Sequence, residues 1–287
     1  MLLSVVVVHY RTLLVLPRCL DALAAETAGL ESEVVVVDND SRDGLLDWLA
    51  GARPVVRAIV NPANVGYAKA VNQGLAATRG ELVLVMNPDV YLAPGALRIL
   101  IDSLRDHART GLVAPELRNP DGTIEYSARS FPGPWTFLFN RYSLLTRLFP
   151  GNPWSRRYLL SDWDRRAARV VDWVSGACMM VRRRAVQEAG GMDEGFFMFN
   201  EDVDWCRRLQ QAGWQVVCEP LAKAVHDVGA SRGRVAPKVI VERHRGMIRY
   251  FHKHHPSHPL IAALADGMIM VRAGLMLARN ALLPRER

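Results

Sequence analysis

The sequence predicts an α/β protein built on a doubly wound, mostly parallel sheet with a helical extension at its C-terminus. Short, continuously apolar runs alternate with stretches whose apolar residues recur at helical spacing, beginning with "LSVVVVH" at 3–9 and "VLPRCLDALAAE" at 15–26. Strands that are apolar on both faces are covered on both sides, as in a parallel sheet between two layers of helices. The 287 residues are enough for one large domain of this kind.

The same alternation predicts the other elements in order. Further strands are expected at 33–39, 55–61 and 81–86, and helices at 66–80 and 94–107. Gly80 is a suitable left-handed C-cap for the first of these helices. Residues 131–170, rich in aromatic residues, Pro and Arg without a clear period, are expected to be an irregular insertion. The remaining expected elements are a turn at 119–123, a strand at 171–183, a helix at 201–213, a strand at 214–220 and a helix at 241–255.

Composition and charge limit the classes of function. The net charge is +7, which favours anionic partners such as nucleic acid, phosphorylated ligands or an acidic membrane face. The four cysteines form no CxxC pair and have apolar neighbours, so we expect reduced core residues of a cytosolic protein rather than a zinc site. The N-terminal apolar run lacks a basic flank and is expected to be a buried strand, not a signal peptide. The basic excess is concentrated at Arg141, Arg147, Arg156, Arg157, Arg165, Arg166 and Arg169.

The segment from Leu260 to Leu283 is mostly apolar but contains Asp266, Arg272 and Arg279. At 100° per residue its large apolar residues form one stripe, with the two arginines beside it. Three arrangements stay open: a helix that lies on a membrane surface, a helix that packs on protein or on a second copy, and a span, which the charges disfavour.

Two predicted strands end in acidic residues at the edge where open parallel sheets bind ligands. The second strand ends in "DNDS" at 38–41 and the fourth in "NPD" at 87–89. Pro88 cannot continue a central strand, so the chain turns outward and Asp89 is expected at the rim, where a carboxylate can bind Mg²⁺ or Mn²⁺. The alternative is that Asp89 only caps the helix that begins near Pro94.

A third acidic cluster, Glu201, Asp202 and Asp204, begins the predicted helix at 201–213 and follows the glycine- and aromatic-rich loop at 190–199. Acidic residues in a first turn also complement the helix dipole, which is the purely structural explanation. Carboxylates this close raise one another's pKa, which suits a general base. His226 follows a later strand and is either a metal or phosphate ligand or a structural residue.

Taken together, these segments resemble the inverting glycosyltransferase family 2, which has the GT-A fold. The resemblance covers roughly residues 3–230 in family order, and "NPD" in place of a DxD triplet is typical of the rhamnosyltransferase-like branch. It implies a transferase domain at 1–230, with a nucleotide-binding half at 1–115 and an acceptor and catalytic half at 116–230, followed by a helical extension at 231–287. The matching segments are "SVVVVHYRT", "VVVVDNDS", "NPANVGYAKAVNQGLAATRGELVLVMNPDV", "WVSGACMMVRR" and "GGMDEGFFMFNEDVDWCRRLQQAGW".

The resemblance also implies roles for individual residues. Asp202 corresponds to the catalytic base, with Glu201 beside it, and Asp89 and His226 correspond to metal ligands. Asn87 departs from the acidic pattern. The residues implied to bind the nucleotide sugar are His9, Tyr10, Asp38, Asn64, Gly66, Lys69, Asn72 and Asn87, with Asp38 on the base. Those implied to lie near the acceptor are Trp173, Ser175, Gly176 and Ala177, although core packing is an equal explanation for Trp173.

The implied activity is metal-dependent transfer of a hexose, with Mn²⁺ or Mg²⁺ as cofactor. The favoured donor is dTDP-rhamnose, and the acceptor is a saccharide or a polyprenyl-diphosphate-linked saccharide in cell-surface polysaccharide synthesis. The expected location is cytoplasmic, and attachment to the inner membrane surface and a homodimer are both left open. A UDP-sugar-dependent transferase and a noncatalytic nucleotide-sugar-binding protein stay as alternatives. Nucleic-acid binding is not expected because no basic face with interleaved aromatics is visible, and a dinucleotide-dependent oxidoreductase would need GxGxxG after the first strand.

Overall fold

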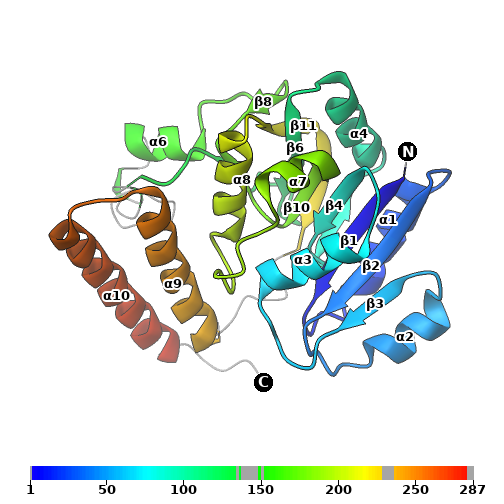
Figure 1. Cartoon of the computed structure of the whole chain (residues 1–287), viewed down its shortest axis with the longest axis horizontal. Coiled ribbons are helices and arrows are strands. Elements are labelled where there is room, and N and C mark those ends of the chain that lie inside the picture. Colours follow the sequence, from blue (N-terminus) through cyan, green and yellow to red (C-terminus); the bar gives the residue numbers. More distant parts are fainter. Residues whose placement is uncertain (1, 134–135, 137–147, 150–151, 228–235, 283–287) are drawn as a thin grey trace.

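The computed structural model describes residues 2–133, 136, 148–149, 152–227 and 236–282. A nine-stranded sheet forms its centre, in the order β3-β2-β1-β4-β10-β6-β11-β5, with β8 paired to β11 outside this path (Figure 1). A small second sheet joins β7 to β9. The strands are β1 (Leu3–His9), β2 (Ser32–Asp38), β3 (Arg57–Val60), β4 (Leu82–Met86), β5 (Val90–Leu92), β6 (Thr110–Arg118), β7 (Ala128–Arg129), β8 (Arg169–Val170), β9 (Trp173–Val174), β10 (Cys178–Arg182) and β11 (Gln215–His226).

Helices cover both faces of this sheet, as the apolar strands predict. Alternate side chains of β1 belong to two separate cores: Val5 and Val7 pack with the helices on one face, and Val6 and Val8 with those on the other. The first core includes residues of α1, α2 and α4, and the second includes residues of α3, α7 and α8. The helices are α1 (Leu16–Thr27), α2 (Leu45–Ala52), α3 (Tyr67–Ala77), α4 (Ala96–Asp106), α6 (Pro153–Leu159), α7 (Arg183–Ala189), α8 (Glu201–Gln211), α9 (Pro237–His254) and α10 (Pro259–Ala281).

Strand direction changes across the sheet. Neighbours are parallel from β3 through β2 and β1 to β4, and again between β6 and β11, whereas β10, β5 and β8 join in antiparallel pairs. His9 is in register with Asp38 in the β1–β2 pair, so the carboxyl ends of these strands lie at one edge. That edge is where ligands bind in open parallel sheets.

Several local predictions need correction. Gly80 is not a C-cap, because α3 ends at Ala77. A Cβ at position 80 would lie 2.5 Å from the Oγ of Ser4, so the glycine permits close packing of two backbone segments. The strand expected at 171–183 is divided into β9 and β10 by a turn, and the described part of the insertion at 131–170 contains α6. The four cysteines are free and buried, as expected.

Ion pairs attach α9 to the rest of the protein. Asp193 pairs with Arg249 at 2.9 Å and with Lys253 at 2.7 Å. Asp204, which is fully buried, pairs with Lys253 at 2.8 Å and with His254 at 2.7 Å. Helix α10 packs along α9, and together they form a helical hairpin at one end of the molecule (Figure 1).

We expect Asp204→Asn to lower the free energy of unfolding by about 3 kcal/mol, because it removes a fully buried carboxylate that pairs with the partly buried Arg208 and Lys253. Burial raises the pKa of Asp204, but hydrogen bonds from Lys253 and Arg208 outweigh this and hold the pKa below its ordinary 3.8. The contribution of ionised Asp204 to the free energy of unfolding is therefore fully present above pH 3.8 and is lost as the pH falls through its lowered pKa. Urea denaturation would measure it. The matched control is Asp102→Asn in the exposed Arg98–Asp102 pair, where a loss of at most ~1 kcal/mol is expected.

Candidate active site

A cavity of about 1020 Å³ opens at the carboxyl edge of the sheet. Its volume is at the upper end of the roughly 300–1,000 Å³ typical of ligand sites, so donor and acceptor can be accommodated together. Its walls come from the ends of β4 and β11, the turn between β9 and β10, the start of α8, and the inner side of α9 and α10. The sequence-predicted residues that line it are Tyr10, Asn64, Gly66, Asn87, Asp89, Trp173, Ser175, Gly176, Ala177, Glu201, Asp202 and His226.

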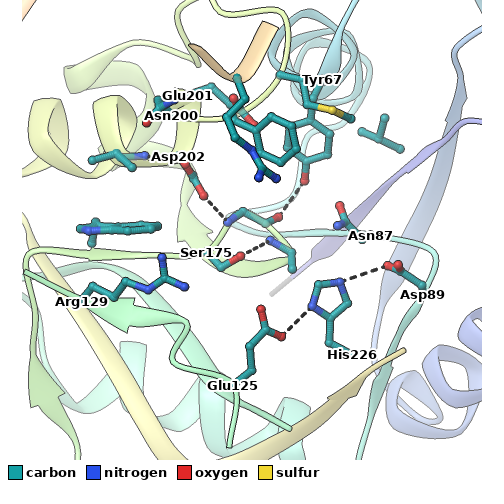
Figure 2. Close-up of a pocket in the computed structure, with 18 of the residues that line it drawn as sticks. Tyr67, Asn87, Asp89, Glu125, Arg129, Ser175, Asn200, Glu201, Asp202 and His226 are labelled. Atoms are coloured by element: carbon teal, nitrogen blue, oxygen red, sulfur yellow. Dashed lines mark hydrogen bonds and ion pairs between the residues drawn. The ribbon is translucent and has the colours of Figure 1, made fainter. Parts of the chain in front are cut away.

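Asp202 is held by backbone donors at the cavity wall. The N–H of Gly176 donates to its Oδ2 at 2.9 Å (Figure 2), and the N–H of Val203 donates to its Oδ1 at 2.8 Å. Glu201 is buried beside it, and its Oε2 has no hydrogen-bond partner among the described residues. Burial, and then the charge of Asp202, raise the pKa of Glu201 well above its ordinary value.

These differences decide which of the two carboxyl groups is ionised. Burial also raises the pKa of Asp202, but the two N–H donors and the positive charge of Arg129 oppose the rise. The first proton taken up by the pair therefore belongs to Glu201, and Asp202 keeps its charge. An ionised carboxylate that faces a cavity can accept a proton from a bound hydroxyl group.

The backbone before α8 is strained into the position that presents these acids. Phe199 and Asn200 both have positive φ, 69° and 68°. Such a conformation costs a non-glycine residue on the order of 1 kcal/mol or more and is concentrated at functional sites. The reversal it produces places Glu201 and Asp202 in the first turn of α8, facing the cavity.

The turn at 175–177 connects Asp202 with the end of β4. Gly176 donates to Asp202 and accepts a hydrogen bond from the hydroxyl group of Tyr67 at 2.7 Å. The neighbouring carbonyl group of Ala177 accepts from the N–H of Asn87 at 2.9 Å. A Cβ at position 176 would lie in ordinary van der Waals contact with the Cβ of Asp202, 3.4 Å away, so the turn packs directly against this side chain. The turn thus positions Asp202 relative to the "NPD" segment.

His226 lies between two carboxylates at the other side of the cavity (Figure 2). Strand β5 follows Asp89 directly and pairs antiparallel with the end of β11, which puts His226 opposite Val90. The Nε2 of His226 is 3.5 Å from Oδ1 of Asp89, and its Nδ1 is 2.8 Å from Oε2 of Glu125. Burial lowers the pKa of His226, but the hydrogen bonds and charges of Asp89 and Glu125 outweigh this and raise it to about 9.

Asp89 and His226 fit a divalent cation. The Oδ1 of Asp89 is buried, and its 3.5 Å contact with His226 is its one side-chain partner among the described residues. Two ligand atoms about 2.1 Å from one ion are roughly 3.0–3.5 Å apart, close to the separation found here. The hydrogen bond between Glu125 and Nδ1 of His226 would leave Nε2 as the atom that binds the ion, which is the usual arrangement for a metal-bound histidine. No group of three or more His, Cys, Asp or Glu side chains is suited to a metal in the described ranges, so phosphate and water oxygens would complete the shell, as is common for Mg²⁺.

If His226 binds metal, Mn²⁺ must displace its proton. We expect Mn²⁺ binding at pH 8 to release close to one proton, because a group with a pKa of about 9 is mostly protonated there. Calorimetry in two buffers of different ionisation enthalpy would count the proton. The His226→Gln variant should release none, and saturable Mn²⁺ binding to the unaltered protein without proton release would contradict this assignment.

Four predicted nucleotide-site residues do not line the cavity. His9 is fully buried and contacts Asp43 at 3.0 Å through Nε2, and Lys69 is exposed on α3. Asp38 is also buried, and its Oδ1 accepts from the N–H of Ser41 at 3.1 Å. Of the three acids implied to act on the donor or acceptor, Asp89 and Asp202 therefore line the cavity, and Asp38 does not.

Asn72 has a structural partner instead of the cavity. Its amide group donates to the carbonyl oxygen of Met192 and accepts from the N–H of Met192, both at 2.8 Å. The helix face that carries Asn72 therefore fixes the loop that leads to α8. Asn72 therefore does not line the cavity, although Tyr67 at the start of the same helix does.

Sequence reasoning missed several residues of the wall. Glu125, Tyr67, Arg129 and Asn39 line the cavity, and the first three contact or influence predicted site residues. Asn39 and Tyr67 had a signal in the sequence, because Asn39 follows Asp38 at the end of a strand and Tyr67 follows Gly66 in a segment that matches the family. Glu125 stands alone after a turn, 101 residues from His226, and no local pattern distinguishes it.

Comparisons with known proteins identify the family of this chain. The model of "Glycosyl transferase family 2" matches residues 4–190. An N-acetylglucosaminyl-diphospho-decaprenol L-rhamnosyltransferase of Mycobacterium tuberculosis (strain ATCC 25618 / H37Rv) is 33% identical over 97% of this chain and 95% of its own length. The rhamnosyltransferase WbbL of Escherichia coli (strain K12) is 42% identical over 51% of this chain and 52% of its own.

Solved structures share the fold at lower identity. The mannosyltransferase PcManGT from Pyrobaculum calidifontis, in complex with GDP-Man and Mn²⁺, is 18% identical with a TM-score of 0.60 over 99% of this chain and 76% of its own. S. aureus TarS 1–349 in complex with UDP-GlcNAc is 17% identical with a TM-score of 0.58 over 94% and 72% of the two chains. The expected GT-A fold is confirmed. The chain belongs to glycosyl transferase family 2.

Proposed function

We propose that this protein is an inverting rhamnosyltransferase that transfers L-rhamnose from dTDP-rhamnose to a polyprenyl-diphosphate-linked saccharide in cell-surface polysaccharide synthesis. The observation that carries the proposal is the relative named N-acetylglucosaminyl-diphospho-decaprenol L-rhamnosyltransferase, which is 33% identical over 97% of the chain. The geometry supports it, because Asp89 and Asp202 line one cavity of sufficient volume for two substrates. The nucleotide-binding half would be 1–115, the acceptor half 116–230, and the extension 231–287.

The proposed chemistry centres on Asp202. The acceptor hydroxyl group would bind near the turn at 175–177 and give its proton to Asp202 while its oxygen attacks the anomeric carbon of the donor. A single displacement breaks the bond between sugar and diphosphate and inverts the configuration. Glu201, which holds the proton of the pair, supplies a neutral neighbour that does not compete for the acceptor proton. A positioned base of this kind contributes about 10²–10⁴-fold in rate.

The donor would bind between β1, α3 and the "NPD" segment. Tyr10, Asn64 and Gly66 line that part of the cavity, and Asn39 donates to the carbonyl oxygen of Gly66 at 3.2 Å. Asp89 and His226 would hold Mn²⁺ or Mg²⁺ against the two phosphates. When bound, such an ion stabilises the charge that develops on the leaving diphosphate.

A donor screen tests the proposal. Purified protein would be incubated with dTDP-rhamnose, UDP-glucose, UDP-N-acetylglucosamine and GDP-mannose, each with Mn²⁺, with Mg²⁺ or with EDTA. The acceptor would be N-acetylglucosaminyl-diphospho-farnesol, a short-chain substitute. We expect transfer from dTDP-rhamnose, with NMR showing the inverted anomer. Preferred transfer from a UDP-sugar would replace dTDP-rhamnose as the proposed donor. Saturable donor binding without transfer would favour a noncatalytic binding protein.

Location on the cytoplasmic face of a membrane is part of the same proposal. Helix α10 is long and apolar enough to cross a membrane by length and composition, and 11% of its most apolar stretch is buried. That low burial distinguishes it from a core helix.

A further inference from the structure

The hairpin of α9 and α10 has two chemically different faces. On the outer face of α10, Leu260, Leu264, Val271 and Leu275 fall within about 60° of one another at 100° per residue. Their exposed fractions are between 65% and 70%, and Met268 beside them is 50% exposed. Single exposed apolar residues are ordinary, but a contiguous stripe of this length indicates an interaction surface.

Charged residues lie outside this stripe. Asp266 is on the opposite side of the helix, where it pairs with His252 of α9 at 2.9 Å. Arg279 is at the edge of the stripe and Arg272 is turned further toward the cavity. A span would place these charges inside the hydrocarbon, whereas a helix that lies on the surface buries only the stripe.

The inner face of the hairpin contributes to the cavity. Arg243, Met247, Tyr250 and Phe251 of α9 and Arg272 of α10 line it. The guanidinium group of Arg272 contacts the sulfur of Met247 at 3.7 Å and makes no ion pair within the described ranges. Arg243 stacks on the ring of Phe199, 4.2 Å from its centroid, next to the strained turn before α8. Arginine forks recognise phosphate groups well.

The two faces together favour a bilayer over a second copy as the occupant of the stripe. The helix that exposes the stripe, α10, also lines the cavity. A lipid of a bilayer that contacts the outer face of the hairpin can therefore place its head group at the cavity on the inner face. Helix α6 lies at the same end of the molecule as the hairpin (Figure 1) and carries Trp154, which is 58% exposed beside Arg156 and Arg157. Tryptophan with basic neighbours is typical of membrane–water interfaces.

Some basic residues of the insertion at 131–170 form ion pairs within the protein. Arg156 and Arg166 pair with Asp162 and Asp164, and Arg165 is close to Glu116 at 4.0 Å. Arg141 and Arg147 lie outside the described residues. The net charge of +7 nevertheless matches an anionic bilayer.

We propose that α10 docks the protein on an anionic bilayer through its outer apolar stripe, and that Arg243 and Arg272 bind the diphosphate of a lipid-linked acceptor where it enters the cavity. This inference rests on the proposed function for its acceptor. It adds the surface that holds the lipid and the residues that select a diphosphate.

Vesicle sedimentation tests the docking surface without any turnover. The full chain is expected to pellet with vesicles of phosphatidylcholine and phosphatidylglycerol (7:3) and less with phosphatidylcholine alone. The double variant Leu264→Asp/Leu275→Asp should lower the bound fraction at least tenfold. Leu46→Asp should not, because Leu46 is an exposed leucine on α2, distant from the hairpin. Equal binding of both variants, or no binding of the unaltered chain, overturns docking. A dimer by light scattering that the double variant converts to a monomer would assign the stripe to a second copy.

Binding of farnesyl diphosphate in vesicle-free buffer tests the arginines. We expect Arg272→Gln and Arg243→Gln each to weaken its affinity at least tenfold, Arg272→Lys to weaken it less, and farnesol affinity to stay unchanged. Arg98→Gln, an exposed arginine on α4, is the control. Circular dichroism would confirm that each variant is folded, and unchanged affinity in both glutamine variants overturns the subsite. Neither measurement needs a donor, so a failed donor screen remains distinguishable from a failed docking surface.

Discussion

Asp202→Asn is expected to lower kcat by about 10²–10⁴-fold while the affinity for the donor stays within a few-fold of normal. Asparagine keeps the shape of the side chain but cannot take a proton from the acceptor hydroxyl group. The hydrogen bond from Gly176 to the side-chain oxygen can survive the change, so the turn at 175–177 should keep its place. Steady-state kinetics with both substrates varied would measure the effect.

Glu201→Gln is the matched control for this experiment. The raised pKa of Glu201 keeps its carboxyl group protonated, and glutamine closely resembles that neutral form. We therefore expect a loss of at most about tenfold for Glu201→Gln, against the full base contribution for Asp202→Asn. In the unaltered enzyme, activity should rise with pH through the raised pKa of Asp202, because the base works only when ionised. Equal turnover of Asp202→Asn and the unaltered enzyme would remove Asp202 from the mechanism.

The sequence predicts the sheet well because the pattern that encodes it is local. Each run of β-branched residues, such as Val5–Val8, has side chains that belong to two cores, and this demands cover on both faces. The same reasoning predicts Asp89, because a proline next to it ends the strand at the ligand edge. Motif order predicts Asp202, and the structure shows the strained backbone at Phe199 and Asn200 that presents it.

The rest of the site depends on contacts that no local pattern encodes. Tyr67 reaches Gly176 across 109 positions of sequence, and Glu125 reaches His226 across 101. The motifs place Asn72 and Asp38 at the nucleotide site, yet neither lines the cavity, and each side chain forms a hydrogen bond with a backbone group instead. A motif fixes which residues are near a site, whereas the side-chain direction depends on how distant loops pack.

The hairpin shows the same limit at larger scale. Periodicity predicts a helix between Leu260 and Leu283 with one apolar stripe, and α10 confirms its existence. It could not predict that Arg272 would line the cavity while Leu264 and Leu275 face outward, because that orientation is set by α9 and by the ion pairs of Asp193 and Asp204.

Asp89→Ala is expected to weaken the Mn²⁺-dependent affinity for dTDP at least about 100-fold. Loss of a group that only orients a metal ligand typically costs 10–100-fold, and loss of a direct ligand should cost no less. The change also removes one of the two carboxylates that pair with His226 in the described part of the chain, so two partners of the proposed ion are altered at once. Calorimetry with dTDP and Mn²⁺ would measure the loss.

Whether the loss of dTDP affinity depends on Mn²⁺ shows whether Asp89 binds the metal or has only a structural role. In EDTA, dTDP affinity should be weak and nearly the same in Asp89→Ala and the unaltered protein, because the cavity walls at Tyr10, Asn64 and Gly66 are unchanged. Asp89→Asn keeps an oxygen in place but removes the charge, and we expect it to fall between the two. If Asp89→Ala weakened the affinity for dTDP equally with and without Mn²⁺, Asp89 would act by shaping the end of β4. The acid of the "NPD" segment would then have a structural role and would not bind a cation.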